Sequence, residues 1–366
     1  MKKILILVNH DVVIYNFRKE LVWELLEQGY EVYLSSPKGE RIPLLQDRGV
    51  KYIPTIVDRH GTSVVGDAKL FRQYLSIMGD IQPDMVLTYT IKPNIYGGMA
   101  ARICKIPYLV NITGLGTALE HEGILQKITT VLYKISMRKA KRIFFQNQEN
   151  LVFFQKKHIG SEAQYYLLPG SGVNLEEFQM LPYPKDEEVH FVFISRIMRD
   201  KGIDEYLEAA EVIRSKYSKV YFHICGFCEE AYQDRLKQLQ KQETIIYHGM
   251  VNDVKEILKT IHCTVLPSYH EGMSNALLES AACGRPVLAS KIPGCQETFD
   301  DRITGIGFEP RNRDALIKAI EMFISLPYET KKNMGRDARK KMEREFDRKL
   351  VVDTYMDVIK TAINKC

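Results

Sequence analysis

The sequence predicts an α/β protein built from two doubly wound domains, each with a parallel sheet. Its 366 residues suit two domains of ordinary size. Short apolar runs alternate with longer amphipathic segments in both halves, the pattern of parallel strands joined by crossover helices. Between the halves, 168–172 and 181–186 are rich in proline, glycine and polar residues. We therefore expect doubly wound domains over 1–175 and 176–345, and a C-terminal helix over 346–366 that packs back on the first domain.

The first half is expected to contain six strands with helices between them. The apolar runs that predict strands are Ile4–Val8, Glu31–Ser35, Lys51–Thr55, Met85–Thr88, Tyr108–Ile112 and Arg142–Phe145. Helix-like segments include Phe17–Gln28 and Lys69–Gly79, and Gly29 fits a C-terminal cap of the first. Ligands in sheets of this kind bind at the carboxyl ends of the strands.

The second half restarts the same alternation. Its expected strands are Val189–Ser195, Val220–Cys225, Ile245–His248, Cys263–Pro267 and Pro286–Ala289. Helices are expected over Ile203–Arg214 and Glu229–Gln240. No Gly-x-Gly-x-x-Gly motif follows any of these strands, which disfavours a nicotinamide dehydrogenase.

Composition excludes several classes of protein. Apolar residues make up 45% and charged residues 27%, as in globular rather than disordered or fibrous chains. No apolar run approaches the ~18 residues of a membrane-spanning helix. The start, Met1-Lys2-Lys3, leads straight into a strand and lacks a cleavage site, so we predict no signal peptide. Seven widely spread cysteines form no disulfide framework and indicate a reducing cytoplasm.

The charge is uneven along the chain. Residues 1–175 have a net charge of +7, from 22 Lys and Arg against 15 Asp and Glu, whereas the remainder is slightly acidic. A basic first half attracts anions such as phosphate, nucleic acid or an acidic lipid surface. A solvated surface without a partner is the alternative.

The densest motif is the run from His270 to Glu279. It follows an expected strand, and Ser274 is placed to cap a helix that continues through Ala276–Cys283. A helix N-terminus gathers backbone N–H donors and can hold a phosphate. Two carboxylates, Glu271 and Glu279, would then grip two sugar rings of one extended ligand. A capped surface helix with unrelated acids is the alternative.

A second motif, residues 195–202, directly follows the first strand of the second half. Arg196 and Lys201 at a strand's carboxyl end suit a diphosphate, because Arg offers a planar fork and Lys a point charge. No Asp-x-Asp pair occurs in the chain, so no metal ligand pair of that type is available. These cations would therefore neutralise a departing diphosphate. A solvated loop is the alternative.

Taken together, these spacings resemble the retaining glycosyltransferases of family 4. The resemblance rests on Glu-x7-Glu at 271–279, on Leu-Pro-Ser at 266–268, on Ala-x-Gly-x-Pro-Val at 282–287 and on the Pro169–Phe178 segment. It implies the GT-B fold, two Rossmann-like domains facing across a cleft, with the donor mostly in the second domain and the acceptor in the first. It also implies that Arg196 and Lys201 bind phosphate, that Glu271 meets the donor sugar, and that Glu279 meets the ribose.

The expected site follows from this resemblance together with the motifs. Arg196, Lys201 and Glu271 are the expected catalytic residues. The expected donor-binding residues are Gly272, Met273, Ser274, Asn275, Ala276, Glu279, Gly226 and Val251. On the acceptor side we expect Asn16, His60 and Thr113. We expect no metal and no other cofactor, because side-chain cations and helix-terminal amides take the metal's place.

The first half departs from the family's common pattern. The loop after its first strand, 9–18, contains no glycine, and Thr113 stands where many members have a catalytic His. No catalytic His is therefore assigned. The run Asn111–Gly116 is instead similar to the branch that builds bacterial surface polysaccharides and lipid-linked oligosaccharides, including N-acetylgalactosaminyltransferases of protein glycosylation.

Three smaller features are open to two interpretations each. Cys225 and Cys228 have CxxC spacing near His223 but no second Cys pair at zinc-ribbon spacing. Gly226 between them would let the chain pass close to the nucleotide. The runs 58–61 and 248–251 are interpreted either as walls of the acceptor cleft and of the base pocket, or as plain turns.

Residues 123–142 form a basic amphipathic segment with six Lys and Arg and no acid. Ile124, Ile128, Val131 and Ile135 recur at helical spacing, with Lys127, Lys134, Arg138 and Lys141 alongside. Such a helix can lie on an anionic membrane. The alternative is a crossover helix with its apolar face on the sheet, and both hold if the apolar face points inward and the basic stripe meets lipid headgroups.

We therefore expect a metal-independent, retaining glycosyltransferase that uses a nucleotide sugar, UDP-linked, and a sugar acceptor on a polyprenyl diphosphate. It would work at the inner face of the cell membrane, with no nucleic-acid partner. One alternative is a non-hydrolysing nucleotide-sugar epimerase, for which the sequence shows no acid/base set. The other is a non-catalytic GT-B binding subunit, in which the Arg/Lys/Glu set would be broken, whereas here it is intact.

Overall fold

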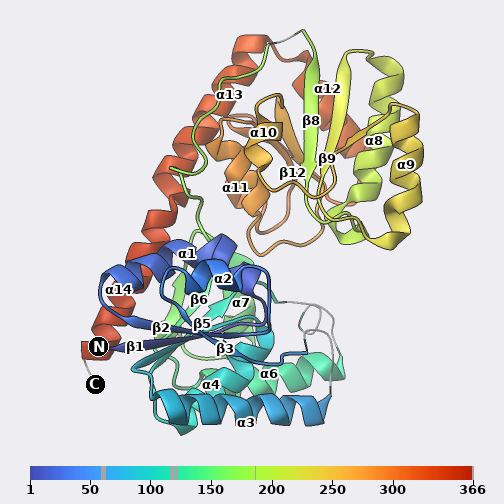
Figure 1. The fold of residues 1–366 in the computed structure, drawn as a ribbon. Coiled ribbons are helices and arrows are strands. Elements are labelled where there is room, and N and C mark those ends of the chain that lie inside the picture. The colour runs from blue at the N-terminus through green and yellow to red at the C-terminus, as the bar shows by residue number, and fades with distance from the viewer. Residues whose placement is uncertain (59–62, 116–118, 120–122, 186, 365–366) are drawn as a thin grey trace. The chain divides into compact units, whose positions relative to one another are not determined.

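The computed structural model of the chain describes residues 1–366 except 59–62, 116–118, 120–122, 186 and 365–366. It contains two compact units (Figure 1). The first comprises Met1–Ser171 together with Arg348–Cys366, and the second comprises Gly172–Asp347. The chain therefore leaves the first unit at Ser171, where the sequence placed the boundary after 175, and returns at Arg348.

The first unit is built on a parallel sheet of seven strands in the order β3-β2-β1-β4-β5-β6-β7. These strands are β1 Lys3–Leu7, β2 Glu31–Ser36, β3 Lys51–Pro54, β4 Met85–Tyr89, β5 Tyr108–Ile112, β6 Arg142–Phe145 and β7 Tyr165–Leu167. Its helices are α1 Asp11–Glu27, α2 Ile42–Gln46, α3 Val64–Ile81, α4 Gly98–Ile103, α6 Ile124–Met137, α7 Gln148–Lys156 and α14 Arg348–Asn364. The apolar runs read from the sequence are strands here because both faces of the sheet are covered.

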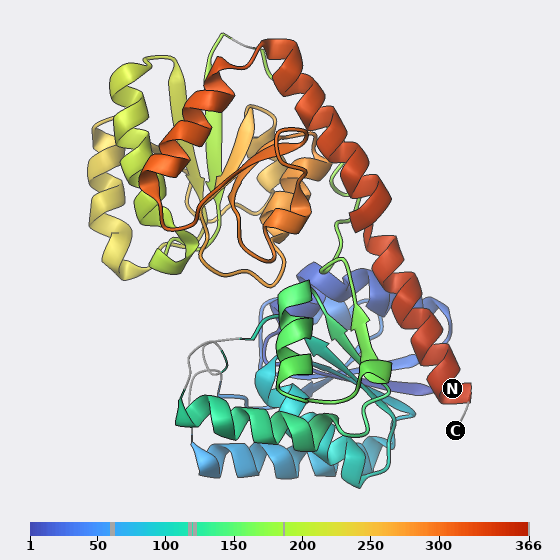
Figure 2. The ribbon, with the colours of Figure 1, turned by 180° about the vertical axis from the view of Figure 1, so that it is seen from behind.

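Each face of this sheet has its own apolar core. Side chains of α1, α2 and α14 pack on one face, and those of α3, α4, α6 and α7 pack on the other (Figure 2). The C-terminal helix α14 is fixed by polar bonds as well as by packing. Arg348 donates to both carboxylate oxygens of Glu20 at 3.0 Å, and the Tyr355 hydroxyl donates to the side chain of Asn111.

The orientation of α6 contradicts one of the two alternatives left open by the sequence, in which the apolar face of this helix packs on the sheet. The apolar stripe is exposed, with exposed fractions of 78% for Ile124, 53% for Ile128, 54% for Val131 and 41% for Ile135. The buried face is largely polar or small and includes Gln126, Thr129, Thr130 and Ser136. The reason is the close approach of α4, where a Cβ added to Gly98 would lie 3.3 Å from the backbone oxygen of Ser136.

The second unit repeats the architecture with six parallel strands in the order β10-β9-β8-β11-β12-β13. These strands are β8 Val189–Ile194, β9 Val220–Cys225, β10 Ile246–Tyr247, β11 Cys263–Leu266, β12 Val287–Ser290 and β13 Gly305–Phe308. The helices are α8 Ile203–Lys216, α9 Gln233–Lys241, α10 Val254–Leu258, α11 Asn275–Ala282, α12 Arg313–Ser325 and α13 Tyr328–Lys341. Side chains of α8, α9 and α12 fill the main core, and α11 and α13 share a smaller one.

Candidate active site

The residues expected to bind the donor follow neighbouring strands of the second unit. Because all six strands are parallel, their carboxyl ends share one edge of the sheet. Arg196 and Lys201 follow β8, Gly226 follows β9, Val251 follows β10 and Glu271 follows β11. The fold therefore gathers these residues at the edge where ligands of open α/β sheets bind.

The central contact at this edge is an ion pair between the two motifs. The Lys201 Nζ lies 2.7 Å from the Glu271 Oε1, and both side chains are mostly buried, with 15% and 13% exposed. The same ammonium donates to the backbone oxygen of His270 at 3.4 Å. Lys201 ends a short 3-10 turn, Arg199–Lys201. The cation expected to bind phosphate and the carboxylate expected to bind the sugar are thus paired directly, which the sequence did not predict.

Two glycines let the loops of this cluster approach each other closely. Gly202 has φ +71°, and an added Cβ would lie 2.0 Å from the backbone oxygen of Pro267, in the β11 loop. Gly226 has φ +145°, and its Cβ would lie 1.8 Å from the oxygen of Ser195, after β8. Gly226 was expected to leave room for a nucleotide, and the structure shows that it leaves room for the neighbouring loop.

The N-terminus of α11 has the cap that the sequence predicts. The Ser274 hydroxyl accepts from the Leu277 N–H at 3.4 Å, but the Ser274 N–H is already used, because it donates to the Gly294 oxygen at 2.8 Å. The N–H groups of Asn275 and Ala276 belong to the first turn, which has no intrahelical acceptors for them. Of the three amides that the sequence assigned to the diphosphate, these two are the ones left to bind it.

Some side chains near this N-terminus are accessible to a ligand, and others pack in the core. Glu279, on the first turns of α11, is half-buried, and the buried Oδ1 of Asn275 has no hydrogen-bond partner among the described residues. Met273 is 7% exposed and packs in the apolar cluster of Val173 and Leu278. Its side chain is therefore part of the core, so only the Met273 backbone is available for the donor-binding role predicted from the sequence.

The loop after β12 supports the Glu271 segment from behind. A Cβ at Gly294 would lie 2.7 Å from the oxygen of Glu271, so the two backbones are in close contact.

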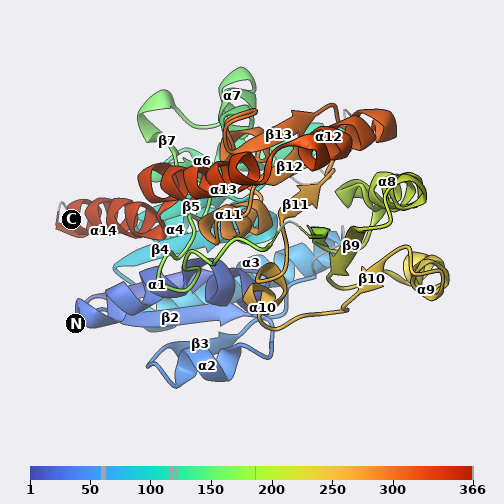
Figure 3. The ribbon, with the colours of Figure 1, turned by 90° about the horizontal axis from the view of Figure 1, so that it is seen from above.

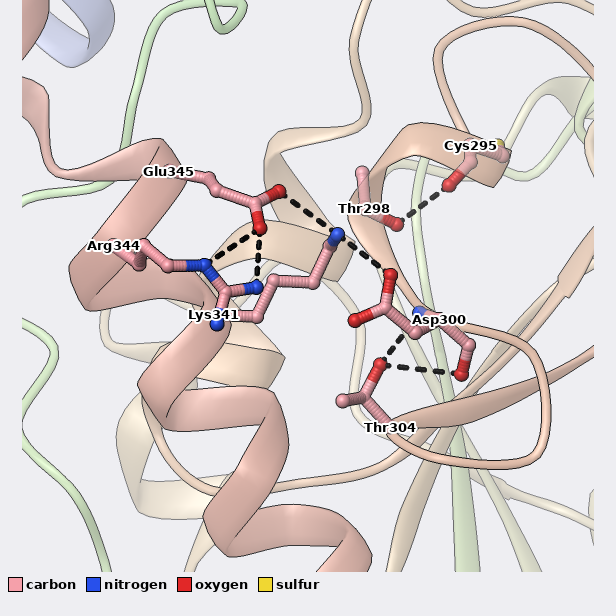
Figure 4. Close-up of polar contacts among 7 residues, drawn as sticks. All are labelled: Cys295, Thr298, Asp300, Thr304, Lys341, Arg344 and Glu345. Carbon is pink, nitrogen blue, oxygen red and sulfur yellow. Dashed lines mark hydrogen bonds and ion pairs between the residues drawn. The ribbon is translucent and has the colours of Figure 1, made fainter.

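Further along the same loop, Asp300 accepts from the buried Lys341 Nζ at 2.9 Å, and Glu345 accepts from it at the same distance (Figure 4). Burial alone would lower the pKa of Lys341, but these two hydrogen bonds outweigh it and raise the pKa.

Two other expected site residues, the catalytic Arg196 and the donor-binding Val251, differ in environment. Arg196 is exposed, and no hydrogen bond or ion pair joins it to another part of the chain that the structure describes. Val251 is half-buried and packs against the cluster of Val192, Cys225 and Leu258, so one side of it belongs to the core. Arg196 is thus the accessible cation of the pair, and Lys201 is the shielded one.

The acceptor-side expectations lie in the first unit. Asn16 is exposed on α1, and its backbone oxygen accepts from Arg348 at 3.2 Å. Thr113 directly follows β5, at the carboxyl edge, and is half-buried. His60 lies outside the described residues. At the same edge, Asp11 is buried at the start of α1 and accepts from the Arg41 N–H at 2.8 Å.

The sequence analysis missed a line of histidines across the second sheet. His190, His223 and His248 come from β8, from β9 and from the residue after β10, and their ring nitrogens are within hydrogen-bond distance in series. His223 had been considered only as a partner of the CxxC cysteines. No group of three metal-ligating side chains occurs within the described ranges, and no described helix is long and apolar enough to span a membrane.

Comparison with known proteins identifies the family. The family described as "Glycosyl transferases group 1" matches residues 176–341, and "Glycosyl transferase 4-like" matches residues 3–147. Together they cover every strand of both sheets except β7. This chain is a GT-B glycosyltransferase of family 4. The resemblance read from the Glu-x7-Glu and Arg/Lys motifs is therefore confirmed.

Individual relatives of this glycosyltransferase are distant but similar over almost their full length. One is the N,N'-diacetylbacillosaminyl-diphospho-undecaprenol alpha-1,3-N-acetylgalactosaminyltransferase of Campylobacter jejuni, 24% identical, with 94% of each chain covered. Another is the UDP-Gal:alpha-D-GlcNAc-diphosphoundecaprenol alpha-1,3-galactosyltransferase of Escherichia coli, 24% identical, with 86% of this chain and 84% of the relative covered. The Anabaena HepE structure in complex with UDP and glucose shares the fold, with a TM-score of 0.81, 15% identity, and 99% of this chain and 100% of that chain covered.

Proposed function

We propose that this glycosyltransferase moves a hexose or N-acetylhexosamine from a UDP-linked donor to a sugar on a polyprenyl diphosphate, with retention at the anomeric carbon. The observation that carries the proposal is the cluster of Lys201, Glu271 and the free amides of α11, with Arg196 at the same sheet edge. The names of two relatives support the substrates, because both specify a sugar on diphosphoundecaprenol and one specifies UDP.

The cluster suits departure of a diphosphate. The C1–O bond to the diphosphate breaks, and negative charge on the leaving oxygens is stabilised by Arg196, by Lys201 and by the Asn275 and Ala276 amides. The acceptor hydroxyl forms the new C1–O bond from the same face and gives its proton to the leaving phosphate. Glu271 binds hydroxyls of the donor sugar while Lys201 holds its carboxylate.

Neither alternative function is favoured. An epimerase needs acid and base groups at the sugar C2, whereas the matched families and relatives are transferases. A binding subunit would not need the Lys201–Glu271 pair. The test is transfer of radiolabelled sugar from UDP-sugars, with GDP- and ADP-sugars as controls, to a sugar on undecaprenyl diphosphate. Label that stays entirely in the water-soluble fraction would contradict the proposed acceptor.

We predict that transfer does not require a divalent metal ion. Activity in excess EDTA should equal the untreated rate, because side-chain cations and helix-terminal amides neutralise the diphosphate. The rate is measured before and after chelation, and again after adding Mg²⁺ or Mn²⁺. Loss of turnover with EDTA that either ion restores would contradict this prediction.

The acceptor lipid also requires contact with a bilayer, and we propose that α6 provides it. The exposed Ile124, Ile128, Val131 and Ile135 form a stripe on this helix, beside the cations Lys127, Lys134, Arg138 and Lys141. Apolar side chains flanked by Lys and Arg are typical of helices that lie in the interface of an anionic membrane. Because the apolar side is exposed, it is available for insertion, unlike in the alternative where it packs on the sheet.

The position of α6 fits delivery of the acceptor. The helix leads from β5 to the parallel strand β6, so its first turn lies at the carboxyl edge of the sheet. Other exposed apolar residues at this edge are Ile56, which follows β3, and Val64 and Val65, which begin α3. A bilayer at this edge would bring the headgroup of a polyprenyl diphosphate to the side of the unit where Thr113 lies.

Two sets of substitutions separate the charge and insertion contributions to binding. Four cations at ~1 kcal/mol each give ~4 kcal/mol, a millimolar-scale affinity, and apolar insertion adds to it. We expect Lys127/Lys134/Arg138/Lys141→Glu to abolish sedimentation with anionic liposomes, and Ile124/Ile128/Val131→Ser to weaken it about tenfold or more. Wild-type binding should fall as NaCl rises.

A matched control reverses exposed cations elsewhere. Lys332/Arg336/Lys340→Glu changes the charge of α13, in the second unit, and should bind liposomes like wild type. Binding of the α6 charge variant equal to that of this control at low salt would show that α6 is not the membrane contact. Wild-type binding indifferent to NaCl would contradict the charge contribution of these cations.

A further inference from the structure

A hydrogen-bonded chain crosses three adjacent strands of the second sheet. It runs from Glu188 to His190 in β8, to His223 in β9 and to His248 after β10. Its links are 3.2 Å from Glu188 Oε2 to His190 Nε2, 2.9 Å from His190 Nδ1 to His223 Nε2, and 2.8 Å from His223 Nδ1 to His248 Nε2. The ring planes of His223 and His248 differ by 5°, and those of His190 and His223 differ by 42°.

The carboxylate at one end fixes the proton positions along the whole chain. An ionised Glu188 only accepts hydrogen bonds, so a His190 that carries a single proton carries it on Nε2 and leaves its Nδ1 unprotonated. His223 Nε2 must then donate to that bare nitrogen, which leaves its own Nδ1 to accept from His248 Nε2. The Nδ1 of His248 is therefore unprotonated and can accept a hydrogen bond.

The surroundings keep the central ring neutral, as this order requires. Burial lowers the pKa of His223 to about 3, and the neighbouring His190 and His248 add to that effect. Burial also lowers the pKa of His248. His262 stands outside the chain, because its Nδ1 accepts from the backbone N–H of His190 and its Nε2 donates to the oxygen of Lys185.

The far end of the chain lies at the donor-binding edge. His248 lines an open pocket of about 910 Å³ together with Phe227, Tyr247, Met250 and side chains of α9, which lies beside β10 (Figure 3). Its neighbour Gly249 accepts from the Gly226 N–H at 2.8 Å, and the Tyr247 hydroxyl donates to the Gly226 oxygen. The pocket thus combines aromatic and apolar side chains with His248, whose protonation is coupled to the histidines of β8 and β9.

We propose that the hydrogen-bonded series of histidines makes His248 Nδ1 an acceptor. It would accept a hydrogen bond from a ring N–H of the nucleotide base, so that uracil is bound in preference to cytosine. Uracil presents N3–H at the position where cytosine has a bare nitrogen, and two facing acceptors repel. His190 and His223 are positioning residues, since they affect the base only by setting which nitrogen of His248 carries the proton. The inference rests on the proposed use of a nucleotide sugar.

The test combines a matched pair of variants with a spectroscopic measurement. In His190→Glu, the carboxylate can only accept from His223, so each histidine keeps its proton on Nε2. In His190→Lys, the ammonium can only donate to His223, so the protons of His223 and His248 move to Nδ1. Binding of UDP and CDP to the full chain is measured by calorimetry. We expect His190→Lys to bind UDP about 5–10-fold more weakly than His190→Glu, the cost of about one neutral hydrogen bond, and to lose preference for UDP over CDP.

Long-range ¹H–¹⁵N spectra of histidine-labelled wild type give a readout independent of the variants. We expect all three rings to carry the proton on Nε2, and the His248 Nδ1 resonance to move when UDP is added. A proton on His248 Nδ1, an unmoved resonance in the UDP complex, or equal UDP affinity of folded Lys and Glu variants would overturn the inference. If wild type binds no UDP, the proposed function and the base-reading role both fail, while the proton order is still decided by the ligand-free spectrum.

Discussion

Replacing Lys201 or Arg196 with alanine should lower kcat/KM by about 10²–10³, the usual cost of removing a charge that stabilises a developing anion. Steady-state transfer kinetics measure the effect. For Lys201 the loss has two components, because its Nζ also holds the Glu271 carboxylate at 2.7 Å. Combining Lys201→Ala with Glu271→Gln should therefore cost less than the sum of the two single changes.

The control for this prediction lies in the same turn. Arg199 is an exposed cation two residues from Lys201, and Arg199→Ala should keep kcat/KM within about threefold, since surface charges contribute little. Thermal unfolding of each variant separates lost catalysis from lost folding. Full activity in both Arg196→Ala and Lys201→Ala would remove the diphosphate assignment.

Replacing Gly226 with alanine should destabilise the second unit by roughly 3–5 kcal/mol, which combines backbone strain with overpacking. At φ +145° an alanine is strained, and its Cβ would lie 1.8 Å from the backbone oxygen of Ser195, which cannot move without displacing the β8 loop. Denaturant unfolding followed by far-UV circular dichroism measures the loss. The single tryptophan, Trp23, lies in α1 of the other unit and does not report on this one.

Gly249 provides the matched control for Gly226. It also has a positive φ, +70°, but nothing lies within 4 Å of an added Cβ. Gly249→Ala should therefore cost only about 1 kcal/mol, from the backbone conformation alone. Equal unfolding midpoints for the two variants would contradict the close approach of the β8 and β9 loops.

Much of the fold could be predicted because parallel strands buried on both faces read as continuous apolar runs. Val220–Cys225 and Arg142–Phe145 are strands with the expected bounds. The cap at Ser274 was also predictable, because an N-cap is a local signal. β13, Gly305–Phe308, was missed because it is short and contains two glycines, which weaken a strand pattern.

The orientation of α6 could not be read from its periodicity. The spacing of Ile124, Ile128 and Val131 defines a stripe but not which way it faces. The packing of Ser136 against Gly98 of α4 decides that, and this contact joins residues distant in sequence. Periodicity alone therefore predicted the apolar stripe and left its direction open.

The site was predictable where its residues follow predicted strands, and not where they meet across the sheet. Lys201 and Glu271 were each placed at a carboxyl end, but their pairing depends on β8 and β11 being neighbours. The histidine chain was missed for the same reason, since His190, His223 and His248 meet only through the order and register of β8, β9 and β10. A predicted strand order combined with the positions of the histidines would have found it.

The account is tested most directly by the anomeric configuration of the product formed from a UDP-sugar and a sugar on undecaprenyl diphosphate. The protein is incubated with both substrates, and with the UDP-sugar alone, and the products are examined by ¹H NMR. We expect a new disaccharide on the lipid whose anomeric coupling matches that of the α-linked donor, and no change in the donor without acceptor. An inverted linkage would contradict retention, and a new epimer of the UDP-sugar formed without acceptor would contradict the transferase itself.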